Sequence, residues 1–156
     1  MNVGDIDKGT YVSVKFSEDT LSAIDDFIGT HKIPNAVPRD KIHCTVVYSR
    51  VKIPYICCAI NELVSTKAHT KVFKTQEGKR ALVLALEDAD CLKMKHDYAS
   101  ILGATYDFPD YIPHVTVSYD IGSLDFPEGK EVDIPFVVVK ECCEDLNLNW
   151  KDTLKD

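Results

Sequence analysis

The chain has 156 residues, which fits one domain or a tightly fused pair of half-domains. Hydrophobic residues make up 45% of it and charged residues 28%, so it can build a core and is not a disordered chain. No run approaches the roughly 18 apolar residues of a membrane span. Residues 1–7 also lack the basic and apolar regions of a secretion signal. We therefore expect a cytoplasmic protein without a membrane partner.

The formal net charge is −7. Because an acidic protein repels long polyanions, we expect no high-affinity binding to DNA or long RNA. A small phosphorylated ligand is compatible with this charge if basic residues gather. Residues 67–80 hold one acid, Glu77, and a cluster of basic residues, for which a solvated, lysine-rich hairpin is the alternative interpretation. The cluster consists of Lys67, Lys71, Lys74, Lys79 and Arg80.

The six cysteines include two vicinal pairs, Cys57-Cys58 and Cys142-Cys143. Neighbours on a strand point to opposite faces and no C-x-x-C spacing occurs, so free thiols in a reducing compartment fit better than disulfides. The H-x-x-x-H and H-E-x-x-H spacings of metal sites are absent as well. We expect neither a metal nor another cofactor.

The predicted elements follow from the spacing of apolar residues and from turn residues. Segment 9–16 alternates and predicts a strand, and apolar residues at helical spacing predict a helix between about Ser17 and Gly29. A loop with Pro34 and Pro38 comes next. The later elements are strands at 42–48 and 55–63, a hairpin over 71–86, a helix over 90–102, and strands at 114–119, 132–141 and 146–150.

The same order of elements occurs twice along the chain. Each half gives a strand, a helix, a proline-containing loop and a strand that opens with His-x-Thr. The two motifs begin at His43 and His114, 71 residues apart, and the same interval lays Tyr48 on Tyr119. This degenerate duplication predicts two lobes related by a pseudo-twofold axis, roughly residues 1–66 and 67–156, which share one core in a single domain.

The duplicated motif places two histidines and two threonines at matched positions. Because residues i and i+2 of a strand lie on one face, His43 and Thr45 point the same way, and so do His114 and Thr116. A pseudo-twofold axis would bring both strands to one cleft. One neutral imidazole can accept a proton from a nucleophile, while a protonated one gives a proton to the leaving oxygen. Hydroxyls can donate hydrogen bonds to the phosphoryl oxygens. The remaining histidines do not match this pattern and are interpreted as surface or structural residues: His31, His69 and His96.

The paired motifs resemble the two-histidine (2H) phosphoesterase superfamily. The chain further resembles the phage anti-CBASS phosphodiesterases, and this similarity covers nearly its whole length. The segments that carry it are 9–12, 42–50, 113–116 and 146–150. The resemblance implies an α+β, bilobal 2H phosphoesterase-like fold, with two lobes of antiparallel sheet flanked by helices and an active-site cleft between them. It also implies metal-independent hydrolysis of 3′–5′ bonds in cyclic di- and trinucleotide signals, such as 3′,3′-cGAMP and cyclic triadenylate.

The same resemblance assigns roles by position. Tyr11 and Trp150 match aromatic positions that pack on nucleobases, a contact that contributes roughly 1–3 kcal/mol per base. Glu144 matches an acid that contacts a base, with nearby Glu141 as the alternative. A core position for Trp150 and an ordinary strand position for Tyr11 remain open. The implied catalytic and phosphate-binding residues are His43, Thr45, His114 and Thr116.

Two other functions share parts of this pattern. A 2H enzyme that acts on RNA ends, such as a cyclic phosphodiesterase or a 2′–5′ ligase-like protein, would share the fold and motifs, although the negative charge disfavours a tRNA-sized substrate. A non-catalytic sponge for cyclic nucleotides could use the same aromatic residues but would not need both histidines. The sequence implies a small cyclic oligonucleotide as partner and no obligate protein partner. It leaves open which histidine is the base.

Overall fold

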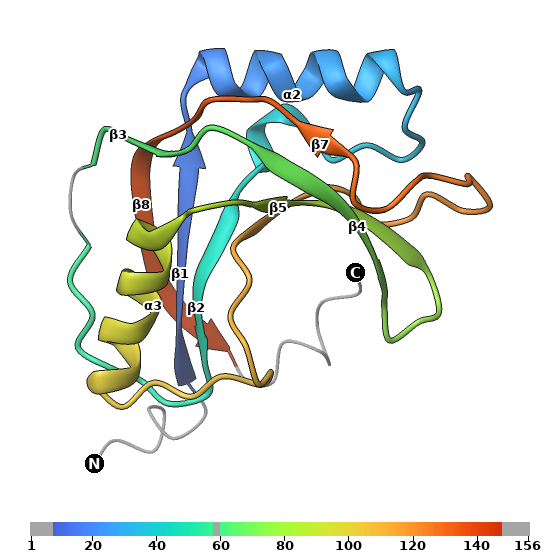
Figure 1. Cartoon of the computed structure of the whole chain (residues 1–156). Coiled ribbons are helices and arrows are strands. Elements are labelled where there is room, and N and C mark those ends of the chain that lie inside the picture. Colours follow the sequence, from blue (N-terminus) through green and yellow to red (C-terminus); the bar gives the residue numbers. More distant parts are fainter. Residues whose placement is uncertain (1–7, 58–59, 148–156) are drawn as a thin grey trace.

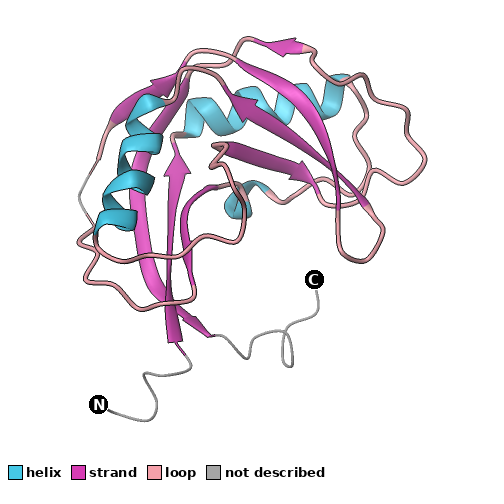
Figure 2. Cartoon of the chain, turned by 60° about the horizontal axis from the view of Figure 1, so that its bottom comes forward, coloured by secondary structure: helices cyan, strands magenta, loops and turns pink. Residues whose placement is uncertain are grey.

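The computed structural model describes residues 8–57 and 60–147, and Trp150 lies outside the described residues. Among these residues, eight strands form one curled sheet in the order β3-β8-β1-β2-β6-β5-β4-β7 (Figure 1, Figure 2). Strand β1 is followed by a helix and then β2, and β5 is followed by a helix and then β6. No helix in the described part of the chain is long and apolar enough to cross a membrane.

The strands are β1 (Lys8–Phe16), β2 (Cys44–Ser49), β3 (Glu62–Ser65), β4 (Ala68–Lys74), β5 (Arg80–Leu86), β6 (His114–Ser118), β7 (Glu131–Val132) and β8 (Phe136–Asn147). The helices are α2 (Glu18–Thr30), α3 (Asp90–Ile101) and the short 3₁₀ helix η1 (Arg39–Lys41). Both long helices agree with the predicted ranges to within two residues.

Three of the predicted strands have other bounds in the structure. Of the strand expected at 55–63, residues 55–57 have no regular structure and residues 62–63 begin β3. The strands expected at 132–141 and 146–150 are divided differently, because Pro135, which cannot donate to a ladder, separates β7 from one continuous β8 that runs to residue 147. Residues 148–150 lie outside the described residues.

Helices α2 and α3 pack on the same face of the sheet, called the helix face below. Its fully buried residues include Val12 and Val14 of β1, Ile24 of α2 and Leu92 of α3. Side chains at alternate strand positions point to the other side of the sheet, called the open face below. The predicted site residues with a described position lie on that open face.

Thr20 anchors α2 to the sheet. Ser17 caps the helix by accepting the Thr20 N–H at 3.2 Å. The buried Thr20 hydroxyl donates to the Pro135 carbonyl at 2.7 Å and accepts the Val137 N–H at 3.0 Å. The start of α2 is therefore held at the start of β8.

Strands β2 and β6 meet at the centre of the sheet, where Cys44 lies opposite Val115. This is the side-by-side arrangement that the duplicated pattern predicted for the two motif strands. β8 flanks β1 and β4 flanks β5, so the C-terminal strand joins the half of the sheet that holds β1 and β2. The predicted ranges, 1–66 and 67–156, therefore do not coincide with the two halves of the sheet, because β8 of the second range lies among the strands of the first.

Each half of the sheet has a β-bulge at the matched place. The β1–β2 register skips Val46, and the β5–β6 register skips Val117. An extra residue breaks the alternation of faces. As a result Tyr48, three positions after Thr45, returns to the open face opposite Tyr11.

Candidate active site

Four predicted residues meet on the open face at the junction of β2 and β6. Cys44 and Val115 lie opposite each other and are fully buried on the helix face. The antiparallel register then sets each motif histidine opposite the threonine of the other motif, with Cβ atoms of directly opposite residues about 4.5–5.5 Å apart. All four side chains are half-buried. We call this group the His/Thr square: His43, Thr45, His114 and Thr116.

Both histidines of the square are oriented by backbone carbonyls two residues earlier. His43 Nδ1 lies 2.8 Å from the Lys41 carbonyl oxygen, and His114 Nδ1 lies 2.7 Å from that of Ile112. A carbonyl only accepts, so Nδ1 carries the proton in each case. Nε2 is therefore the nitrogen left for proton transfer in both rings. Sequence reasoning missed this, since a backbone acceptor has no residue signature.

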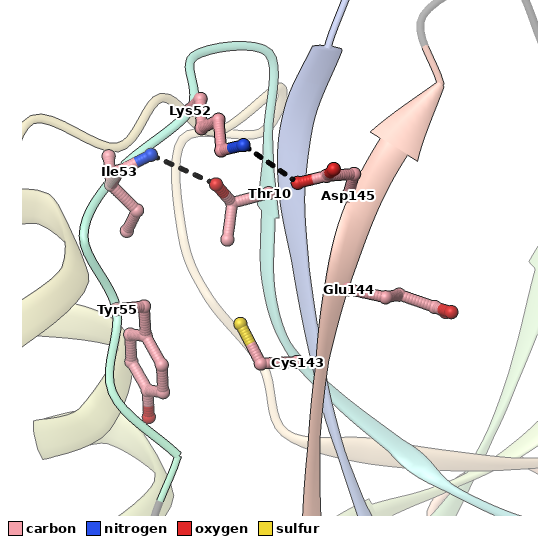
Figure 3. A pocket seen from close by; sticks show the side chains of 7 residues that line it. All are labelled: Thr10, Lys52, Ile53, Tyr55, Cys143, Glu144 and Asp145. Atoms are coloured by element: carbon pink, nitrogen blue, oxygen red, sulfur yellow. Dashed lines mark hydrogen bonds and ion pairs between the residues drawn. The ribbon is translucent and has the colours of Figure 1, made fainter.

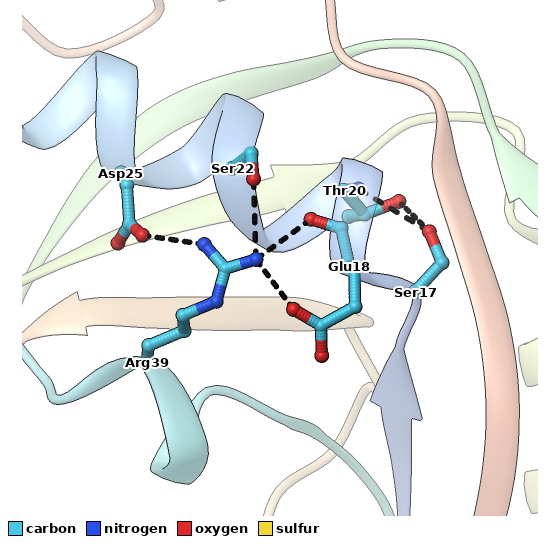
Figure 4. Close-up of polar contacts among 6 residues, drawn as sticks. All are labelled: Ser17, Glu18, Thr20, Ser22, Asp25 and Arg39. Carbon is cyan, nitrogen blue, oxygen red and sulfur yellow. Dashed lines mark hydrogen bonds and ion pairs between the residues drawn. The ribbon is translucent and has the colours of Figure 1, made fainter.

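Arg39 fixes the segment that precedes His43. Its guanidinium donates to Glu18 Oε2 and to Asp25 Oδ2, both at 2.7 Å, and to the Ser22 hydroxyl at 3.1 Å (Figure 4). The two carboxylates raise the pKa of Arg39. These contacts tie η1 to α2, and η1 ends at Lys41, whose carbonyl orients His43.

The surroundings of His114 lower the pKa of its imidazole. Burial lowers the pKa of His114 below 6.5, the charge of His43 lowers it further, and the bond to Ile112 acts in the opposite direction. The Phe73 ring meets the His114 ring edge-on at 5.5 Å between centroids. His114 is therefore mainly neutral at pH 7.

Tyr11 links the predicted base-contact residues to the square. Its hydroxyl lies 2.9 Å from Thr45 Oγ1. Tyr11 lies between Glu144, opposite it on β8, and Tyr48, opposite it on β2. The rings of Tyr11 and Tyr48 meet edge-on, with their centroids 6.1 Å apart. Burial is the main cause that raises the pKa of Tyr11, so its hydroxyl stays protonated.

Glu141 faces the other side of the sheet. It is 8% exposed, its Oε2 lies 3.1 Å from Lys95 Nζ, and it accepts a bond from the Tyr55 hydroxyl at 3.3 Å. Glu144, an odd number of positions away, lies on the open face instead. Of the two acids considered for a base contact, Glu144 is the one beside Tyr11.

The tertiary structure adds two residues that support the first motif. The Tyr111 hydroxyl donates to the Thr45 carbonyl at 2.7 Å, and its ring stacks on His96 at 4.2 Å between centroids with an interplanar angle of 5°. His96 Nδ1 donates to the Val46 carbonyl at 2.8 Å. His96 is thus structural, as the sequence suggested.

The second motif receives the matched support from a different element. Val117, the bulge residue of β6, has its carbonyl bonded by the Val37 N–H at 2.8 Å. A loop backbone does here what His96 does for Val46. The two motif strands are therefore held at equivalent carbonyls by residues that share no sequence pattern.

A cavity of about 360 Å³ lies beside β1 and β8, away from the His/Thr square. The Lys52–Asp145 ion pair, 3.4 Å long, lies at this cavity (Figure 3). Glu144 also lines it, but its side chain points to the opposite side of β8 from Tyr55 (Figure 3). This cavity does not include the predicted catalytic residues.

Residues 8–57 and 60–147 contain no group of three or more His, Cys, Asp or Glu side chains arranged to hold a metal ion. All five cysteines in these ranges are free thiols.

A family model described as anti-CBASS protein Acb1 matches residues 8–153. The chain belongs to the anti-CBASS protein Acb1 family. The Acb1 protein of Acinetobacter phage Ac42 is 47% identical over 97% of this chain and 99% of its own length. That of Enterobacteria phage T4 is 46% identical over 99% of both chains. The predicted membership of a phage anti-CBASS family is confirmed.

The fold is similar to that of a solved 2H phosphoesterase. The crystal structure of E. coli LigT complexed with ATP matches with a TM-score of 0.51 and 10% sequence identity, over 87% of this chain and 85% of LigT. At this identity the similarity concerns the fold alone. The predicted α+β, 2H phosphoesterase-like fold class is confirmed.

Proposed function

We propose that this member of the Acb1 family is a metal-independent phosphodiesterase. It hydrolyses 3′–5′ bonds of cyclic di- and trinucleotide signals, such as 3′,3′-cGAMP and cyclic triadenylate, in the cytoplasm of an infected bacterium. A phage thereby evades CBASS immunity. The observation that carries the proposal is the His/Thr square, in which both imidazoles direct Nε2 away from their Nδ1 anchors on one face of the sheet.

His114 acts as the base in this mechanism and His43 as the acid. The lowered pKa of His114 keeps it neutral, so its Nε2 can take the proton of the ribose 2′-hydroxyl. The 2′-oxygen attacks phosphorus, and the departing 5′-oxygen receives a proton from His43 Nε2. The product is linear and ends in a 2′,3′-cyclic phosphate, or in a 3′-phosphate after water adds.

The threonines bind the phosphoryl oxygens in this proposal. If the Tyr11 hydroxyl donates to Thr45 Oγ1, the Thr45 proton is left for the phosphate, where negative charge grows in the transition state. Thr116 does the same from β6. Tyr11 and Glu144 contact a nucleobase from the neighbouring strands, and Trp150, outside the described residues, supplies a second stacking surface.

The test is incubation of the purified protein, in excess EDTA, with 3′,3′-cGAMP and with cyclic triadenylate, followed by mass spectrometry. We expect linear products with a terminal phosphate. His43→Ala and His114→Ala should each lose about 10²–10⁴-fold in rate. The double variant should be little worse, because the pair acts as a unit.

His31→Ala is the matched control, since His31 packs between Phe27 and Phe126 away from the square. Full activity of either single variant of the square would overturn the mechanism. Intact ligand that stays bound would favour the sponge. Intact, unbound cyclic nucleotides together with cleavage of 2′,3′-cyclic phosphate RNA ends would favour the RNA-end enzyme.

A further inference from the structure

Lys71 lies on the open face, in line with the His/Thr square. It is opposite Val83 on β5, and Val83 is opposite Thr116 on β6. Directly opposite residues share a face, so all three side chains point to the same side of the sheet. Neighbouring strands are about 4.8 Å apart, which puts the Lys71 backbone roughly 10 Å from that of Thr116. Its four-carbon stem can cross the small Val83 toward the square.

Lys15 flanks the square from the other side. Val14 lies opposite Cys44, so the next residue of β1, Lys15, lies beside His43. Val14 faces the core, and Lys15 therefore faces the open side. Because His43 is opposite Thr116, Lys15 and Lys71 stand at the two ends of one row that crosses the sheet through the square.

These two lysines differ from the other lysines in their surroundings. Within residues 8–57 and 60–147, every lysine without an ion pair to a carboxylate is solvent-exposed except Lys15 and Lys71, which are half-buried. Lys15 also has a like charge, Lys140, directly opposite on β8. The lysines that do form ion pairs are Lys52, Lys67, Lys79 and Lys95.

The basic segment 67–80 does not act as one patch. Lys67 pairs with Glu131 at 3.0 Å and Lys79 with Glu77 at 3.6 Å. Arg80 donates to the backbone carbonyls of residues 122 and 124. Lys74 is exposed on the opposite side of β4. Lys71 is thus the lysine of this segment that combines partial burial with the absence of an ion pair among the described residues, whereas the guanidinium of Arg80 is held by backbone carbonyls.

Lys15 and Lys71 are half-buried, which fits stems that pack along the open face while the ammonium groups, without an ion pair among the described residues, are free to contact an anion. Two such groups at opposite ends of a row through the square would be compensated by anions bound on each side of it. The reacting phosphate occupies the square itself. The flanking positions therefore suit further phosphates of the same ligand.

We infer that Lys15 and Lys71 form two anion subsites that hold the non-scissile phosphates of a cyclic oligonucleotide. This inference rests on the proposed function and deepens it, since it names how the site recognises a ring with more than one phosphodiester. A single-phosphate ligand would fill the square alone. A ring presents its remaining phosphates to the lysines while one bond lies between the histidines.

The test compares Lys71→Met and Lys15→Met with the wild-type protein on cyclic triadenylate, which has two phosphates besides the scissile one. Methionine keeps most of the stem and removes the charge. Lys74→Met, on the same strand as Lys71 but facing the other side, is the matched control. Each substitution removes a charge-assisted contact made equally in the ground and transition states, so it should raise KM about 10–100-fold and leave kcat within about twofold. Lys71→Arg keeps the positive charge and should have a KM close to that of the wild-type protein.

A second measurement does not depend on turnover. In the His114→Ala background, calorimetry should give a roughly 10–100-fold weaker Kd for cyclic triadenylate with each lysine variant, because each variant loses one charge-assisted contact. Values of KM and Kd equal to those of Lys74→Met would overturn the inference. So would a loss in kcat at constant KM, which would place the lysine on the reacting phosphate. If the wild-type protein cleaves the ring and the lysine variants match the control, the inference fails and the proposed function stands.

Discussion

Replacing Tyr111 with phenylalanine should damage both the stability of the fold and the rate of the reaction. The Tyr111 hydroxyl donates to the Thr45 carbonyl at 2.7 Å, next to the only residue pair that joins β2 to β6 in the described ladder. Burial is the main cause that raises the pKa of Tyr111, so the hydroxyl remains a donor at every working pH. The variant keeps the ring that stacks on His96 and removes this bond together with the contact between the hydroxyl and Cys44 Sγ at 4.0 Å.

The expected loss follows from the missing donor. Leaving a buried carbonyl without its partner costs about 1–3 kcal/mol. For a chain of this size each kcal/mol lowers Tm by roughly 2–4 °C, so Tm should fall by about 2–12 °C. Thr45 also loses a backbone restraint, and a displacement of about 1 Å in a catalytic group costs on the order of 100-fold in rate. We expect kcat to fall by about 10–100-fold on that basis, with KM nearly unchanged.

Calorimetric unfolding and steady-state cleavage of 3′,3′-cGAMP measure the two effects. Tyr106→Phe is the control, because Tyr106 packs edge-on against both His96 and Tyr111 and its hydroxyl makes no hydrogen bond within the described part of the chain. Equal Tm and kcat for the two variants would refute the reasoning. A lower Tm with unchanged kcat would show that Tyr111 supports the fold without positioning Thr45.

Three further predictions concern His114 and Gly9. Because burial and the charge of His43 lower the pKa of His114 from 6.5, the acidic limb of kcat/KM should have its midpoint below pH 6.5, and a midpoint above pH 6.5 would contradict the role of His114 as base. His43→Gln should raise the pKa of His114 measured by NMR. The lowered pKa of His114 also makes a stabilising contribution that is complete above pH 6.5 and is lost as the pH falls through the lowered pKa, because the unfolded chain binds the proton first. The free energies of unfolding of wild type and His114→Ala, measured in urea, should therefore differ least at the acid end. A Cβ on Gly9 would collide with the Ser49 carbonyl, so Gly9→Ala should cost about 1–3 kcal/mol in urea unfolding, whereas Gly29→Ala, with nothing within 4 Å, should not destabilise.

The features that the sequence predicted correctly depend on short-range patterns. The His-x-Thr spacing by itself puts each histidine and its threonine on one face of a strand, since side chains alternate. The duplication around His43 and His114 then required the two motif strands to be related, and the structure has them adjacent. The assignments of these residues to catalysis, and of Trp150 to base stacking, remain predictions.

The errors and omissions have a different origin. The strand expected at 55–63 has the composition of a strand, yet residues 55–57 have no regular structure and residue 53, just before them, bonds to the Thr10 side chain. The bulges at Val46 and Val117, which return Tyr48 to the open face, depend on pairing between strands and have no local signature. Sequence reasoning therefore could not have found Tyr48 by alternation.

The sequence by itself determined the pair of motifs, their matched positions in a repeated order of elements, and the family resemblance. All three are properties of the order of residues along the chain. Only the tertiary structure decided which nitrogen of each imidazole is held by a carbonyl and that Glu144 and not Glu141 lies beside Tyr11. It also decided that Lys67 and Lys79 of the basic segment pair with carboxylates, while Lys71 has no such partner among the described residues. These depend on the distances between groups far apart in the chain, and folding alone sets those distances.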